Sequence, residues 1–102
     1  MLVGQAAVDE SRAEPRDETC RRVRVYDAAG AREPMLVVNL SPSGLMARTE
    51  VGVQVGELLT FDLPEIGVRV AEVRWALGGR LGCRFAVAIP PSIYPRTLAA
   101  LR

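Results

Sequence analysis

The segment of residues 39–44, with the sequence NLSPSG, interrupts the otherwise apolar run of residues 35–47. The residues on either side favour buried extended segments, so the polar hexapeptide predicts a tight corner between two strands. Asn39 offers an amide that both donates and accepts, Ser41 a hydroxyl, and Gly44 a backbone that can take positive φ or let a ligand approach closely. The same pattern is also that of an ordinary turn. A binding role therefore needs support from elsewhere in the chain.

Arg12 and Arg16, with Pro15 between them, are a second set of residues that could bind a ligand. All 13 basic residues of the chain are arginines, so every cation is a planar fork with a permanent charge. The surrounding segment, residues 1–18, has no sustained periodicity and carries five acids: Asp9, Glu10, Glu14, Asp17 and Glu18. We expect a flexible arm that cannot order itself without a ligand and that Pro15 keeps extended.

The composition argues against catalysis. Histidine and lysine are both absent, which removes the usual general base, histidine metal ligands, the P-loop cation and Schiff-base chemistry. Cys20 and Cys83 are too few for a four-thiolate zinc site and look like apolar strand residues in a reducing compartment. The net charge of +1 gives no argument for a nucleic-acid polymer as partner. We expect no enzyme, no cofactor and no metal.

The chain shows no targeting or membrane signal. No basic segment followed by about 7–15 apolar residues opens the sequence, and no apolar run approaches the roughly 20 residues that span a bilayer. We expect a cytoplasmic protein that does not insert into a membrane.

Alternation of apolar and polar residues predicts a sheet that positions these groups. In the first strand Val23 and Val25 should face inward, and the run of residues 35–38 should be core. The six expected strands span residues 19–26, 35–40, 44–49, 57–63, 67–77 and 81–89. Five arginines are expected on outward faces: Arg22, Arg24, Arg69, Arg74 and Arg84. Six short strands joined by glycine turns suggest an all-β fold, a small antiparallel barrel without exposed edges.

Residues 92–102 predict a short C-terminal helix that packs through Ile93, Leu98 and Leu101. The expected organisation is a flexible arm over residues 1–18 and one barrel domain with its helix over residues 19–102.

Two motifs stand in order along this framework. Residues 12–16 form an R-x-x-x-R and residues 39–44 an N-x-S-x-x-G. Together with EVRW at residues 72–75 and LGCRF at residues 81–85, the pair resembles the PilZ domain family over roughly residues 12–89. Members of that family are six-stranded barrels that bind the bacterial second messenger cyclic di-GMP through an arginine motif before the first strand and a [D/N]-x-S-x-x-G motif on the barrel surface.

The resemblance implies a ligand site made of Arg12, Arg16, Asn39, Ser41 and Gly44. The arginines would meet guanine edges or phosphodiester oxygens and stack on purine faces. Asn39 would address a base edge or the ribose, Ser41 would donate to a phosphate oxygen, and Gly44 would let the backbone come close. Such a receptor would change its shape or its contact with a bacterial effector protein when loaded.

Two alternatives stay open at this point. Trp75 is a secondary candidate for stacking on a base, whereas a lone tryptophan on a barrel strand is more often a core residue. Some proteins with this fold bind no nucleotide, so a ligand-independent adaptor that docks onto another protein is the alternative function. Acidic residues of the arm that form ion pairs with Arg12 or Arg16 would compete with the phosphates of the ligand for these arginines.

Overall fold

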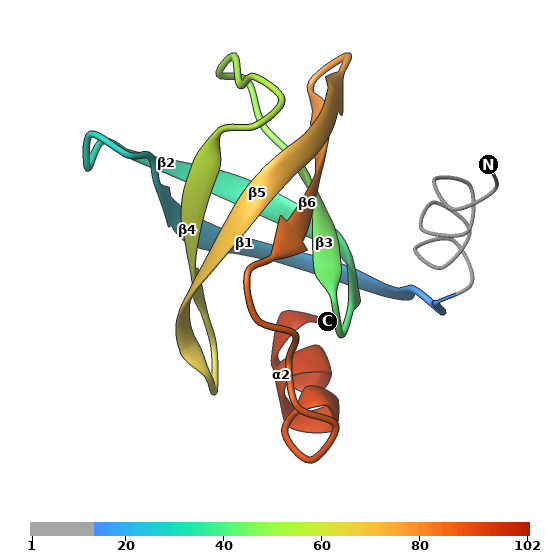
Figure 1. Cartoon of the computed structure of the whole chain (residues 1–102). Coiled ribbons are helices and arrows are strands. Elements are labelled where there is room, and N and C mark those ends of the chain that lie inside the picture. The colour runs from blue at the N-terminus through green and yellow to red at the C-terminus, as the bar shows by residue number, and fades with distance from the viewer. Residues whose placement is uncertain (1–13) are drawn as a thin grey trace, which may run out of the picture.

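The computed structural model describes residues 14–102; residues 1–13, including Arg12, lie outside it (Figure 1). The described chain contains β1 (Asp17–Tyr26), β2 (Arg32–Ser41), β3 (Gly44–Arg48), β4 (Leu58–Leu63), β5 (Gly67–Leu77), β6 (Arg80–Phe85) and α2 (Tyr94–Leu101). The strands close into a barrel in the order β1-β2-β3-β6-β5-β4, and neighbouring strands are antiparallel. The expected six-stranded barrel with a C-terminal helix is confirmed.

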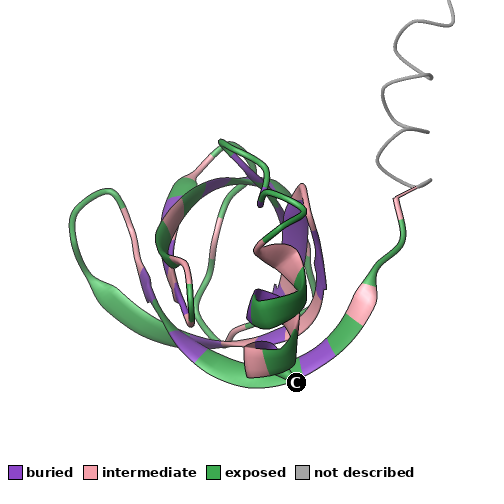
Figure 2. Cartoon of the chain, turned by 90° about the horizontal axis from the view of Figure 1, so that it is seen from below, coloured by how far each residue is buried: buried purple, intermediate pink, exposed green. Residues whose placement is uncertain are grey.

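The barrel is filled from the inner face of each strand. Val23 and Val25 are buried as expected, and Figure 2 shows buried residues recurring around the ring. Helix α2 lies beneath the barrel in Figure 1, and its Leu101 belongs to the same core while Ile93 and Leu98 pack against it. Within residues 14–102, no helix is long and apolar enough to cross a bilayer.

Some element boundaries differ from those expected. Strand β1 begins at Asp17, so the sheet takes in two residues that we expected in the arm. Strand β6 ends at Phe85 and not at Ile89 because the chain leaves β5 and crosses to the β2–β3 hairpin, where the Ile89 amide donates to the Pro42 carbonyl at 2.8 Å. The chain then leads into α2, whose first residue, Tyr94, reaches the Leu40 carbonyl oxygen of β2 with its hydroxyl.

A β-bulge in β2 decides which way the residues before the hairpin face. The register with β3 shifts between Val37 and Asn39, so Val38 is an extra residue and the inward phase changes. Val37 is buried before the bulge and Leu40 after it, whereas Val38 is only partly buried. The expectation that the whole 35–38 run is core was wrong at two positions: Leu36 alternates with the buried Met35 and Val37, and Val38 is the bulge residue. The bulge turns Asn39 to the outer surface.

Arg69 is also placed differently from the expectation. It shares the inner face of β5 with Ala71 and Val73 and is half-buried, and its Nε is buried with no hydrogen-bond partner in the described chain. The strand alternation brings this arginine to the inner face near the start of β5. The other four arginines expected on outward faces are exposed.

The two cysteines have different surroundings. Cys83 is buried on β6, as expected for an apolar strand residue, but Cys20 is exposed on β1. Burial, followed by the negative charge of Glu57, raises the pKa of Cys83 to about 12. The Cys83 thiol therefore stays protonated at neutral pH and is a packing residue.

Candidate ligand-binding site

The two sequence motifs meet at one corner of the barrel. Asp17 stands opposite Leu40 and Glu18 opposite Asn39 in the β1–β2 ladder, so the segment before β1 runs alongside the β2–β3 hairpin. At this corner Arg16 Nη1 donates a hydrogen bond of 3.0 Å to Asn39 Oδ1. Arg16 is exposed and Asn39 is half-buried. The structure thus brings together two of the predicted site residues that lie 23 positions apart in the chain.

A second contact joins the motifs through residues that the sequence did not single out as site residues. If the register that pairs Asp17 with Leu40 continues, Glu14 lies opposite Ser43. The Ser43 hydroxyl does donate a hydrogen bond to Glu14 Oε1, and both side chains are half-buried. Both residues occupy variable positions of the two motifs. Only the strand register could have indicated that they meet.

Ser41 and Gly44 hold the hairpin itself. Ser41 is 1% exposed, and its hydroxyl lies 3.4 Å from the Gly44 carbonyl oxygen. Gly44 does not take a positive φ, but a Cβ there would overlap the Cys83 carbonyl of β6. The glycine is thus needed so that β3 can pack against β6. A contact of either residue with a ligand stays a prediction.

Trp75 lies on the same outer surface as Asn39. Asn39 Nδ2 lies 3.6 Å from the Met46 sulfur, Met46 stands opposite Gly82, and Gly82 stands opposite Trp75. The indole covers Gly82 so closely that a Cβ there would collide with it. A register shift between Val73 and Trp75 turns the ring outward, where it is 38% exposed. Trp75 is therefore a surface residue in line with the site.

Helix α2 is tied to the site by one hydroxyl. Tyr94 Oη lies 2.7 Å from Asp17 Oδ2 and 3.0 Å from the Leu40 carbonyl oxygen. Asp17 follows Arg16 and Leu40 follows Asn39 in the chain. Burial, the hydrogen bond to Asp17 and the negative charges of Asp17 and Glu14 raise the pKa of Tyr94 above its ordinary value. The hydroxyl therefore stays protonated and holds α2 against the strands that carry the site.

Replacing Tyr94 by phenylalanine should lower the free energy of unfolding by about 1 kcal/mol, because the Asp17 carboxylate and the Leu40 carbonyl lose the hydroxyl that lies within hydrogen-bond distance of them. Since folding raises the pKa of Tyr94 above its ordinary 10.0, the advantage of the wild type should be full below pH 10 and decline at higher pH. Urea unfolding at pH 7 and pH 11 measures both effects. The control is Tyr26→Phe; an equal loss in that variant would contradict the role assigned to Tyr94.

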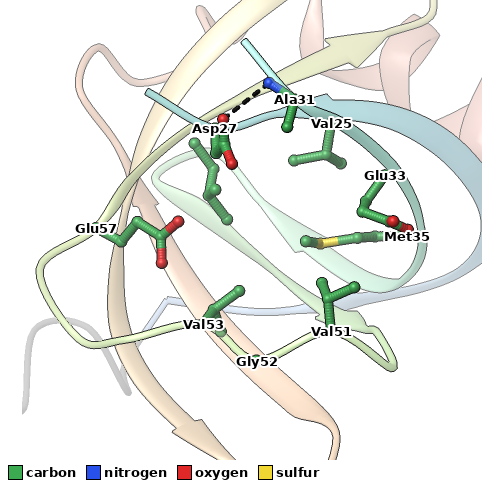
Figure 3. Close-up of a pocket in the computed structure, with 10 residues that line it drawn as sticks. Val25, Asp27, Ala31, Glu33, Met35, Val51, Gly52, Val53 and Glu57 are labelled. Atoms are coloured by element: carbon green, nitrogen blue, oxygen red, sulfur yellow. Dashed lines mark hydrogen bonds between the residues drawn. The ribbon is translucent and has the colours of Figure 1, made fainter. Parts of the chain in front are cut away.

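A separate pocket of about 170 Å³ lies at the β1–β2 turn (Figure 3). Met35 is among its apolar lining residues, and three carboxylates also line it: Asp27, Glu33 and Glu57. Asp27 Oδ1 accepts hydrogen bonds from the Ala29 and Ala31 amides, both at 2.9 Å, so this carboxylate holds the turn. The acids make the pocket unsuitable for a phosphate-bearing ligand. They also do not form a metal site, because no group of three or more His, Cys, Asp or Glu residues among residues 14–102 could hold an ion.

Comparison with protein-family models matches residues 10–100 to the PilZ domain. The match spans both motifs, Arg12 included, as well as the barrel and most of α2. Comparison with curated proteins finds no match. PilZ domains are non-catalytic receptor domains, which agrees with the expectation of no enzymatic activity. The matched residues cover far more than half of the sequence and carry the observed barrel, so the chain belongs to the PilZ domain family.

Proposed function

We propose that this PilZ domain is a cytoplasmic receptor for cyclic di-GMP that changes its conformation or its effector-protein partner on binding. The family typically binds this nucleotide. The observation that carries the proposal is the hydrogen bond between Arg16 and Asn39, because it places the arginine motif and the hairpin motif at one surface.

The groups gathered at this corner suit the ligand. Arg16 presents a planar fork that can meet the O6 and N7 acceptors of a guanine or two oxygens of a phosphodiester group. Arg12, four residues earlier, would supply the second fork. Asn39 offers an amide to a base edge, and the exposed ring of Trp75 offers a stacking surface along the same face of the barrel. Ser41 is proposed to act at the phosphate after a small movement of the hairpin, since its hydroxyl is buried.

Calorimetric titration of the full chain with cyclic di-GMP tests the proposal. We expect saturable heat at tens of micromolar protein, and no comparable signal from GTP or cyclic GMP. Circular dichroism of the same sample shows whether the barrel is folded. If the folded protein gives no heat of binding with cyclic di-GMP, it is not a receptor for this nucleotide.

A ligand-independent adaptor is the second candidate function, favoured by exposed apolar side chains on the outer face of β4 and β5. Leu58, Val68 and Val70 are 54%, 62% and 43% exposed. Exposed apolar groups that gather on one face are suited to protein contacts. An adaptor of this kind would bind its partner equally with and without cyclic di-GMP, whereas the receptor would not.

A further inference from the structure

The Ser43 hydroxyl and the Glu14 carboxylate are the two groups at the motif corner to which neither motif assigns a function. We infer that Ser43 is a further phosphate-binding donor of the site, and that Glu14 is an internal anion that occupies it until a phosphate of the nucleotide takes its place. This inference rests on the proposed function.

The contact itself shows what Ser43 can bind. Its hydroxyl proton is directed at a carboxylate oxygen of Glu14, and a phosphodiester group presents the same kind of anionic oxygen acceptor. Ser43 lies in the hairpin that also carries Asn39 and Ser41. A phosphate that reaches this hairpin therefore meets the donor that Glu14 now uses.

The register of the arm explains why the carboxylate competes directly with the ligand. In an extended segment, residues two apart face the same side, so Glu14 and Arg16 both face the hairpin, where each makes its hydrogen bond. The fork that would attract a phosphate and the carboxylate that would repel it thus act at one surface. The carboxylates of Glu14 and Asp17 also lie close enough to Tyr94 for their charges to raise its pKa, after the larger effect of burial.

An internal anion of this kind makes the site selective. A simple anion that gains only the Ser43 hydroxyl cannot replace Glu14 favourably, because it exchanges one charge-assisted hydrogen bond for another. A ligand that also engages the arginines and Asn39 gains contacts that Glu14 does not make. The expected result is a site that rejects small anions and binds the full nucleotide with an apparent affinity lowered by the competition with Glu14.

The test is calorimetric titration with cyclic di-GMP of four variants beside the wild type: Glu14→Gln, Glu14→Asp, Ser43→Ala and the double variant Glu14→Gln with Ser43→Ala. Glu14→Gln removes the charge and should tighten binding about five- to tenfold, because a neutral acceptor holds the hydroxyl less strongly. Glu14→Asp keeps the charge but is one methylene too short to hold Ser43, and should tighten binding about threefold. In the Ser43→Ala background, the effect of Glu14→Gln should fall below twofold.

The outcomes separate this inference from the proposed function. If neither the wild type nor any variant binds the nucleotide although all of them are folded, the receptor proposal fails. If all bind, but Glu14→Gln tightens binding equally with and without Ser43, or Glu14→Asp behaves like the wild type, the acid acts only by diffuse repulsion. Either of those results overturns the role of Ser43 as a masked donor and leaves the receptor function standing.

Discussion

Replacing Gly44 by alanine should lower the free energy of unfolding by about 3 kcal/mol, a large part of the roughly 5–15 kcal/mol of a domain of this size. The added Cβ would overlap the backbone carbonyl of Cys83. No side-chain rotation can relieve a clash with backbone, so β3 and β6 must separate where Gly44 pairs with Arg84. Urea unfolding followed by circular dichroism measures the loss.

Gly52→Ala is the matched control. Gly52 has open space around its Cα and does not take a positive φ, so alanine there should be neutral or slightly stabilising. Equal stability of the two variants would show that the barrel tolerates separation of β3 from β6. The same variant also tests the role of Gly44 in the motif. If the loss of nucleotide binding in Gly44→Ala matches the fraction of protein that is unfolded, the glycine is needed for the hairpin structure and not for contact with the ligand.

The barrel was predictable because alternation is a local signal. Val23 and Val25 repeat every second residue and point inward as expected, and the glycine turns lie where strands end. The errors arose at bulges and strand ends. An extra residue at Val38 reverses the phase of β2, so Leu40 is buried beside the outward Asn39. The position of this extra residue depends on how β2 pairs with β3, and the sequence of one strand alone does not specify that pairing.

The sequence predicted some residues of the site but not all of its contacts. The resemblance of the motifs pointed to Arg16 and Asn39, and the structure brings them into contact. The contact between Glu14 and Ser43 could not be predicted from the sequence. It requires the β1–β2 register to continue before Asp17, where β1 begins. The sequence also could not show that Ser41 is buried, because a serine in a turn is ordinarily exposed.

Arg16→Ala should weaken cyclic di-GMP binding about 100-fold, because it removes up to two charge-assisted hydrogen bonds worth roughly 1.5 kcal/mol or more each. Arg16→Lys should still weaken binding about tenfold: the charge remains, but an ammonium group cannot make the bidentate or stacked contacts of the fork. Calorimetric titration gives both affinities. Since Arg16 is exposed, neither variant should change the unfolding midpoint measurably.

Arg22→Lys provides the control for charge, because Arg22 lies exposed on β1, away from the hairpin, and should bind as the wild type does. Arg12→Lys is expected to resemble Arg16→Lys if the two arginines act as a pair. The effect at Arg16 must also be opposite in sign to that at Glu14, since the two side chains reach the same hairpin with opposite charges. Unchanged affinity in both lysine variants would mean that the arginine motif supplies only diffuse attraction, and that recognition of the bases lies with Asn39 and Trp75.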